Sequence, residues 1–258
     1  MQLTINGRNA LITGGSLGIG RAIAARFLDS GANVAIVARR QEMLDEAKGA
    51  LASKGSGKIV TIAADVATAE GCATACRTAL AELGQVDVLV NNAGTSQRAD
   101  FVEITDEVWH ADIDLKLFAA IRLTRELMPK MRERKWGRVV NVLNTGAKAP
   151  PPSGAPTAVT RAAGLALTKV LAGEGAPDNV LVNAVLVGRI ESDQWERRAQ
   201  NQNKDVSQVY AEMGPTIPMG RVGTAEEFAN IVTMLASDQG SYVTGTAINI
   251  DGGLCPVV

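Results

Sequence analysis

The sequence predicts an α/β protein with a doubly wound parallel sheet of about seven strands, a Rossmann-like fold in a single domain. Two observations predict this fold. Short β-rich runs alternate with longer stretches of helical periodicity along the chain. Most of these runs are almost continuously apolar, which is typical of strands covered on both faces. Since strand–helix alternation implies right-handed crossovers, it favours one parallel sheet with helices on both sides.

Seven segments are predicted to be strands. They are residues 9–13, 33–38, 58–63, 87–91, 138–143, 180–185 and 246–250. Between them, apolar residues recur at helical spacing. One long helix is predicted from the apolar positions Val108, Ile113, Phe118, Ile121, Met128 and Met131. No repeat or linker interrupts the pattern, so residues 1–258 are expected to form one dinucleotide-binding domain.

Residues 188–220 break the strand–helix rhythm. This segment is rich in polar residues and ends in Gly-Pro-Thr-Ile-Pro before residue 219. A long insert after the carboxyl end of a strand is typical of a segment that covers a ligand. We therefore predict that residues 188–220 form a substrate lid. The alternative is a solvated excursion of the surface.

The composition argues against several classes of function. The 26 basic and 27 acidic side chains give a net charge of −1, whereas nucleic-acid binding needs a basic field. No apolar run approaches the ~18 residues of a membrane span, and the first eight residues carry no secretion signal. Three cysteines and one distant histidine favour neither a disulfide framework nor a metal site. We expect a cytoplasmic protein without a metal.

A glycine-rich turn follows the first predicted strand. Residues 13–21 read Thr-Gly-Gly-Ser-Leu-Gly-Ile-Gly-Arg. Gly14, Gly18 and Gly20 let the backbone turn tightly and approach a pyrophosphate, and the next helix points its N-terminal amides at the phosphate charge. Because the turn lies between a strand and a helix, it indicates dinucleotide binding.

Several motifs resemble those of the short-chain dehydrogenase/reductase family over nearly the whole chain. The spacing Gly-x-x-x-Gly-x-Gly, the Asn-Asn-Ala-Gly at 91–94 and the segment 243–253 are similar to family motifs. Residues 183–188 resemble its Asn-x-x-x-Pro-Gly, with Val187 in place of the proline. The resemblance implies a Rossmann-like fold and a nicotinamide cofactor.

The resemblance also implies which residues hold the cofactor. Asp65 and Val66 stand where the family contacts the adenine ring, and Ser192 stands where it often has a threonine beside the nicotinamide. With two arginines considered next, the expected set is Gly14, Ser16, Gly18, Ile19, Gly20, Arg39, Arg40, Asp65, Val66, Asn91, Ala93, Gly94, Arg161, Gly188, Ile190 and Ser192.

The charge after the second predicted strand indicates the type of cofactor. An acidic residue there would bind the adenosine ribose and repel a 2′-phosphate. This chain has Ala38 instead, followed by Arg39 and Arg40. An arginine can form charge-assisted bonds to a phosphate, so NADP(H) is favoured over NAD(H), with Arg39 the stronger candidate. The alternative is that both arginines are merely solvated.

The catalytic positions depart from the family pattern. Family members that reduce ketones share an asparagine, a serine, a tyrosine and a lysine. In this chain Asp114 stands in place of the asparagine, Asn144 in place of the serine, Thr157 in place of the tyrosine and Arg161 in place of the lysine. Neither of the two tyrosines has a lysine four residues later.

These departures change the expected chemistry. The hydroxyl of Thr157 is a far weaker acid than a phenol, and Arg161 stays charged and cannot pass on a proton. Arg161 can still bond ribose hydroxyls, and Asn144 can donate an amide hydrogen to a carbonyl oxygen. Asp114 can pair with Arg161 or Lys116.

Three functions remain open at this stage. The favoured one is an NADP(H)-dependent oxidoreductase of a small carbonyl or alcohol, with a proton donor displaced to Lys148, Asp193, Tyr210 or water. The second is a catalytically silent NADP(H)-binding sensor or scaffold. The third is elimination or dehalogenation on the same scaffold, which an intact glycine turn disfavours.

Assembly is a further expectation from the resemblance. Members of the family are commonly dimers or tetramers built on the long helices and the last strand. The apolar end of the chain, residues 254–258, would favour association if exposed. We expect a homodimer or homotetramer.

Overall fold

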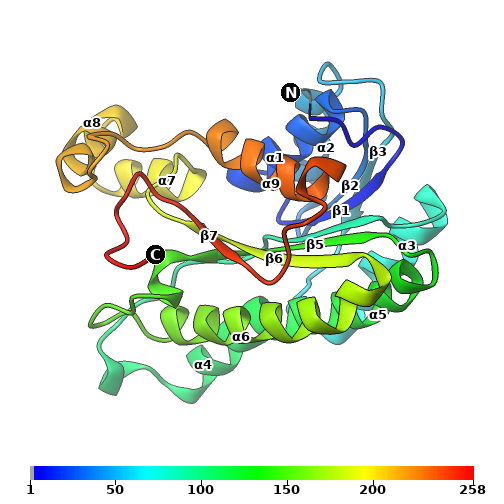
Figure 1. Ribbon diagram of the computed structural model, residues 1–258. Helices are drawn as coiled ribbons and strands as arrows, with labels where there is room; N and C mark the ends of the chain where they lie inside the picture. Colours follow the sequence, from blue (N-terminus) through cyan, green and yellow to red (C-terminus); the bar gives the residue numbers. More distant parts are fainter. Residues whose placement is uncertain (1–2) are drawn as a thin grey trace.

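The computed structural model describes residues 3–258, so residues 1 and 2 of the predicted domain lie outside it. Within that range, seven parallel strands form one sheet in the order β3-β2-β1-β4-β5-β6-β7 (Figure 1). The strands are β1 (Asn9–Thr13), β2 (Asn33–Ala38), β3 (Ile59–Ala63), β4 (Val88–Asn91), β5 (Gly137–Asn144), β6 (Val180–Val187) and β7 (Ala247–Ile250). Each lies where the sequence predicts a strand, so the predicted doubly wound sheet is confirmed.

Helices cover both faces of the sheet, which explains why the strands are apolar throughout. Figure 1 shows one layer made of α1 (Gly18–Asp29), α2 (Gln41–Leu51) and α9 (Ala225–Ala236), and an opposite layer made of α3 (Ala69–Leu83), α5 (Ala119–Glu133) and α6 (Thr157–Gly175). Phe27 and Phe228 are fully buried in the first layer, and Leu123 and Met131 are buried in the second.

The strand order reverses beside β1. The chain runs from β1 outward through β2 and β3, then returns to place β4 on the other side of β1. Connections after β1 and β4 therefore lead to opposite layers. In open α/β sheets, such a switch point leaves a crevice at the carboxyl ends of the strands, where ligands bind.

The long helix predicted before β5 is interrupted. It consists of α4 (Asp106–Ile113), a π-helical turn (Asp114–Phe118) and α5. A π-helical turn accommodates an extra residue and is frequent at functional sites. Here it turns the side chain of Lys116 into the protein interior.

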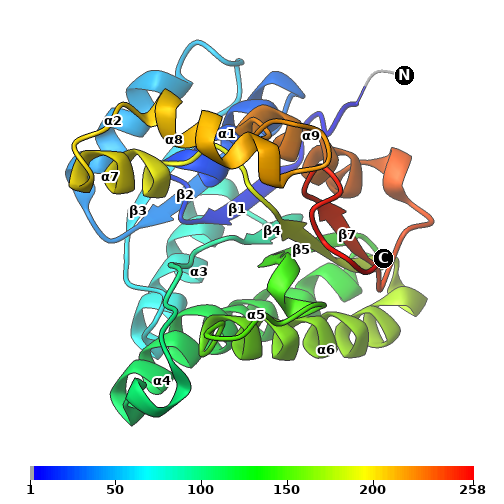
Figure 2. The same cartoon turned by 90° about the vertical axis from the view of Figure 1, so that its left-hand side faces the viewer.

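Residues 188–220 include two helices, α7 (Asp193–Asn201) and α8 (Val206–Met213). The two ends of the segment lie side by side. Glu191 N donates to Gly223 O (2.9 Å), and Gly223 N donates to Arg189 O (2.9 Å). Figure 2 shows α7 and α8 in the layer of α1 and α2, opposite the layer that carries α4. The segment is thus folded, and its role as a substrate lid stays a prediction.

Of the helices in residues 3–258, none is long and apolar enough to cross a membrane.

Candidate active site

The glycine turn has a backbone shape that only glycine adopts readily. Gly14 and Gly18 have positive φ angles of +65° and +51°, a region that is costly for other residues. A Cβ on Gly20 would lie 2.1 Å from the carbonyl oxygen of Gly14. The side chain of Asn92, after β4, donates to Thr13 O (2.8 Å) and Gly14 O (3.2 Å). The end of β4 therefore fixes the turn that follows β1.

The other expected cofactor residues follow the carboxyl ends of β1, β2, β3, β4 and β6. Ser16 and Ile19 follow β1, Arg39 and Arg40 follow β2, Asp65 and Val66 follow β3, Asn91 ends β4, Ala93 and Gly94 follow β4, and Gly188, Ile190 and Ser192 follow β6. Parallel strands end at one edge of a sheet, so these residues share that edge. The start of α7 closes on it, because a Cβ on Gly18 would lie 2.9 Å from Asp193 Oδ1 and 3.7 Å from Ser192 Cβ.

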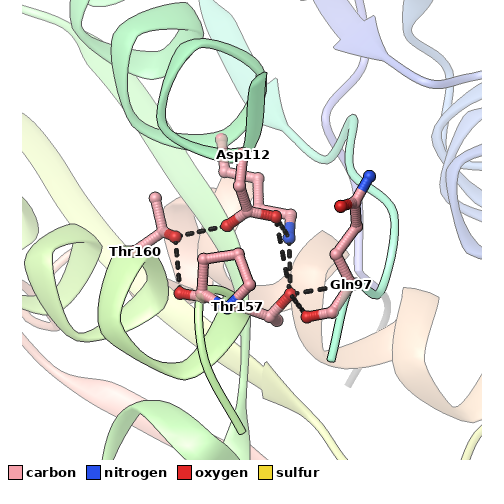
Figure 3. Close-up of polar contacts among 6 residues, drawn as sticks. Gln97, Asp112, Thr157 and Thr160 are labelled. Atoms are coloured by element: carbon pink, nitrogen blue, oxygen red, sulfur yellow. Dashed lines mark hydrogen bonds and ion pairs between the residues drawn. The ribbon is translucent and has the colours of Figure 1, made fainter. Parts of the chain in front are cut away.

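The hydroxyl of Thr157 is the centre of a buried polar cluster (Figure 3). Thr157 is the first residue of α6 and is 3% exposed. Its Oγ1 accepts from Lys116 Nζ (2.8 Å) and from Gln97 N (3.0 Å), and it donates to Gln97 O (2.7 Å). The cluster thus joins α6, the loop after β4 and the π-helical turn.

Asp112 holds the other side of this cluster. Its carboxylate forms an ion pair with Lys116, and the side chains of both residues have no exposed surface. The Thr160 hydroxyl, one turn further along α6, also bonds to Asp112, as Figure 3 shows. We call Asp112, Lys116, Thr157 and Thr160 the Thr157 cluster.

Electrostatics make Lys116 an acid suited to neutral pH. Burial lowers its pKa to about 8, and the nearby Arg161 charge adds to that effect, while the hydrogen bond and charge of Asp112 oppose it. Burial also lowers the pKa of Arg161 to about 10, with Asp112 opposing. Near pH 7 two cations therefore face one carboxylate, and the site carries a net positive charge.

Arg161 connects this cluster to the cofactor side of the site. The Arg161 guanidinium lies against the backbone of Gly94, since a Cβ on Gly94 would lie 2.3 Å from Arg161 Nη2. Within residues 3–258 the guanidinium makes no ion pair and no hydrogen bond, although Arg161 is only 9% exposed. A buried guanidinium without a partner is costly. Together with the glycine turn, it fits a ligand that offers hydroxyl or phosphate oxygens, as a dinucleotide does.

The comparisons with known proteins agree with this geometry. The family model described as enoyl-(acyl carrier protein) reductase matches residues 14–255. The uncharacterized oxidoreductase YvrD of Bacillus subtilis is 33% identical, over 98% of each chain. The chain belongs to the short-chain dehydrogenase/reductase family. It is therefore an oxidoreductase of a family that binds a nucleotide cofactor.

Two solved structures of this family are especially informative. L-sorbose reductase from Gluconobacter frateurii, complexed with NADPH and L-sorbose, has a TM-score of 0.94 and 34% identity, with both chains covered completely. An NADPH-bound short-chain oxidoreductase from Pseudomonas aeruginosa has a TM-score of 0.91 and 34% identity, covering 99% of this chain and 100% of that one. The latter is described as containing an atypical catalytic center.

The four expected catalytic residues of this short-chain dehydrogenase/reductase are only partly brought together. Thr157 and Arg161 lie one turn apart on α6, and both face Lys116. Asn144 ends β5, where its Oδ1 is buried with no hydrogen-bond partner in the described part of the chain. Its Nδ2 makes no hydrogen bond within residues 3–258, so the donor side of the amide is unpaired.

Asp114 lies outside the Thr157 cluster. Its half-exposed carboxylate pairs with Arg122 (3.0 Å) instead of Arg161 or Lys116, which corrects the pairing expected from the sequence. The side chain that reaches Thr157 from this helix belongs to Lys116. The π-helical turn is the physical reason, since it changes which positions face inward.

Two of the displaced proton donors expected from the sequence, Lys148 and Asp193, are engaged elsewhere. Lys148 Nζ donates to Ala247 O (2.8 Å), and Asp193 pairs with Arg197 (2.6 Å). Burial raises the pKa of Tyr210, on α8. Across residues 3–258 none of the three side chains bonds to the Thr157 cluster.

Sequence reasoning missed Asp112 and Lys116 as site residues. Two signals were available: Lys116 stands between two leucines, Leu115 and Leu117, and Asp112 lies four residues before it, where helical side chains meet. The Gln97 contacts carry no such signal, because they use backbone atoms.

Proposed function

We propose that this protein is an NADP(H)-dependent reductase of a small carbonyl compound, with a proton passed from Lys116 through Thr157. The observation that carries the proposal is the 2.8 Å hydrogen bond from the buried Lys116 ammonium to the Thr157 hydroxyl. It answers the main chemical objection to a threonine at this position. Thr157 need not be the acid if it relays a proton from a stronger one.

The residues at the cofactor end support NADP(H). Arg39 and Arg40 follow β2, are exposed, and form no ion pair or side-chain hydrogen bond within residues 3–258. Arginine forms bidentate bonds to phosphate, so Arg39 is proposed to bind the 2′-phosphate. Arg161 is proposed to bond the ribose beside the nicotinamide. Bound NADPH would supply the hydride of the reduction.

The chain's own residues are proposed to supply the proton. The Thr157 hydroxyl turns from Gln97 O to the substrate oxygen and donates its proton there. An N–H proton of Lys116 replaces it, which leaves a neutral amine that has to take up a proton before the next turnover. A donor with a pKa of about 8 suits this transfer near neutral pH.

The net positive charge of the site supports the same step. Negative charge develops on the substrate oxygen during reduction, and preorganised cations in a buried site stabilise it strongly. Lys116 and Arg161 supply two cations against the one carboxylate of Asp112. The Nδ2 group of Asn144, at the end of β5, is proposed to donate a hydrogen bond to the carbonyl oxygen and so to orient it.

Replacing Thr157 tests the proposal. Thr157→Val keeps the side-chain volume and removes the hydroxyl, so kcat for NADPH-dependent reduction should fall about 10²–10⁴-fold, as expected for lost general acid catalysis. NADPH affinity, measured by fluorescence titration, should change little. The matched control is Thr157→Ser, which restores a hydroxyl and should recover most of kcat. Equal turnover by the valine and serine variants would refute the relay.

A carbonyl panel separates this function from a silent one. Tight NADPH binding by the wild-type chain without oxidation of NADPH on any carbonyl would instead support a nucleotide-binding sensor or scaffold.

A further inference from the structure

Three arginines gather where the lid segment meets the loop after β4. Arg189 follows β6 and is half-buried, while Arg98 and Arg198 are exposed. The Arg189 and Arg198 guanidinium carbons lie 5.3 Å and 5.5 Å from the centre of the Trp195 ring, within cation–π range. Burial lowers the pKa of Arg189, and the charges of Arg98 and Arg198 lower it further. We call these three residues the arginine cluster.

The arginine cluster borders the catalytic residues on one side and the predicted lid on the other. Arg98 follows Gln97, whose backbone bonds to Thr157 Oγ1, and it forms a β-bridge with Pro156. Arg189 and Arg198 belong to the lid segment, whose helix α7 begins against the glycine turn. A molecule held between these two sides would reach from the arginine cluster to Thr157.

No carboxylate neutralises the arginine cluster. Among the ion pairs and side-chain hydrogen bonds of residues 3–258, none involves Arg98, Arg189 or Arg198. Asp193, on the same helix as Arg198, pairs with Arg197 (2.6 Å) instead. Three like charges converge here without compensation.

Such an arrangement is costly unless a ligand completes it. Like charges repel, and partial burial of Arg189 removes some of its water. Guanidinium groups form strong, planar hydrogen bonds with carboxylate and phosphate oxygens. Contact with Trp195 restricts two of the three side chains, so less entropy is lost when an anion binds.

We propose that the substrate is an anionic carbonyl compound, whose carboxylate or phosphate group is bound by the arginine cluster while its carbonyl lies at Thr157. The inference rests on the proposed reductase function for the fate of the carbonyl. The anion-binding part stands on the arginine cluster alone. It therefore predicts binding as well as turnover.

Matched ligand pairs test the proposal by calorimetry on the NADP⁺-loaded protein. The probes are a series of straight-chain oxo-carboxylates against their methyl esters, and dihydroxyacetone phosphate against dihydroxyacetone. At least one anion should bind about 10–100-fold more tightly than its neutral partner, as expected for charge-assisted hydrogen bonds. The two pairs also distinguish a carboxylate substrate from a phosphorylated one. If no anion binds more tightly than its neutral partner, the proposal is wrong.

Variants then assign the effect to the arginine cluster. Arg189→Gln should abolish most of the preference for the anion, and Arg98→Gln, at an exposed side chain, should reduce it. The matched control is Lys204→Gln, which removes a lid cation that pairs with Glu212 and should leave the preference intact. NADP⁺ affinity should be unchanged in all three variants. A preference that survives both arginine substitutions would overturn the proposal.

Turnover separates this inference from the proposed function. Anions that bind through Arg189 but never oxidise NADPH would contradict the reductase function and leave the anion site standing. If neutral ketones are reduced as fast as their acidic counterparts, and Arg189→Gln has no effect, the result would contradict the anion site and support the reductase function.

Discussion

Two regions of the site, the glycine turn after β1 (the cofactor end) and the Thr157 cluster (the catalytic end), owe their shapes to different parts of the chain. At the cofactor end, backbone atoms set the shape, with Gly14 and Gly18 at positive φ and Gly20 against a carbonyl. At the catalytic end, buried charges and hydroxyls set the shape, with Lys116, Asp112 and Thr157 bonded across distant segments. The first depends on the absence of side chains, and the second on particular side chains being present together.

This difference predicts how the two ends respond to substitution. A glycine turn accepts no side chain at its tight positions, so it keeps a recognisable pattern. A polar cluster can exchange its members provided that buried charges stay paired and hydrogen-bonded. Lys116, Thr157 and Arg161 are such a set, and the comparison predicts separable effects of mutation at the two ends.

The largest expected effect comes from breaking the buried ion pair. Lys116→Met leaves the Asp112 carboxylate without its counterion, so the free energy of unfolding should fall by about 3–5 kcal/mol, measured by urea denaturation. The proton relay should be lost with it. The double variant Asp112→Asn, Lys116→Gln replaces both charges and should recover most of the stability but not the turnover. Full activity in that double variant would contradict the catalytic role of Lys116.

A smaller effect is expected from crowding the glycine turn. Gly20→Ala places a Cβ 2.1 Å from Gly14 O, and the backbone shift costs about 1–3 kcal/mol. NADPH affinity should weaken about 10–100-fold, while kcat at saturating NADPH should change little. Gly49→Ala is the control, because nothing lies within 4 Å of a Cβ there. Equal affinity in both variants would show that the turn does not hold the cofactor.

A more selective change sharpens the comparison within the cofactor end. Arg39→Gln should weaken NADPH binding about tenfold, because one exposed charge-assisted contact to the 2′-phosphate is lost. NADH binding should not change, since NADH lacks that phosphate. Arg77→Gln, an exposed position on α3, serves as the control. Parallel losses for both nucleotides would place Arg39 away from the phosphate.

The mildest expected effect is a pH dependence of turnover. The proposed relay needs Lys116 protonated for reduction, and the pKa of Lys116 is about 8, so kcat for reduction should fall to half near pH 8 and decline further above it. Oxidation of the alcohol needs the neutral amine and should rise over the same range. Steady-state rates with buffer controls measure both directions. A reduction profile that stays flat through pH 9 would exclude Lys116 as the acid.

The sheet was predictable because its signal is local. Each strand is a short apolar run, such as residues 9–13, and burial on both faces requires that pattern. The glycine turn was equally readable, since tight turns and close backbone contacts limit the residue type. Only strand ends differ, as for β5 and β6, which run further than predicted to Asn144 and Val187.

The catalytic end was harder to predict because its contacts depend on the path of the backbone. Asp114 and Lys116 are only two residues apart, and the flanking leucines and the spacing from Asp112 do not by themselves show which of the two side chains reaches Thr157. The π-helical turn makes that choice, and its presence is not visible in helical periodicity. The backbone of Gln97, which binds Thr157 from the loop after β4, leaves no trace in the residue pattern.

The π-helical turn also has a consequence for transplanting this catalytic chemistry. Each residue of an α-helix advances the side-chain direction by about 100°, so a helix without the extra residue of Asp114–Phe118 would point the equivalent lysine elsewhere. Grafting Lys116, Thr157 and Arg161 into a relative with an unbroken helix would reproduce the residue types of the site but not the positions of their side chains. To place these side chains as they lie here, such a relative would need one inserted residue in the helix as well as the three substitutions. The graft would therefore change the length of the chain.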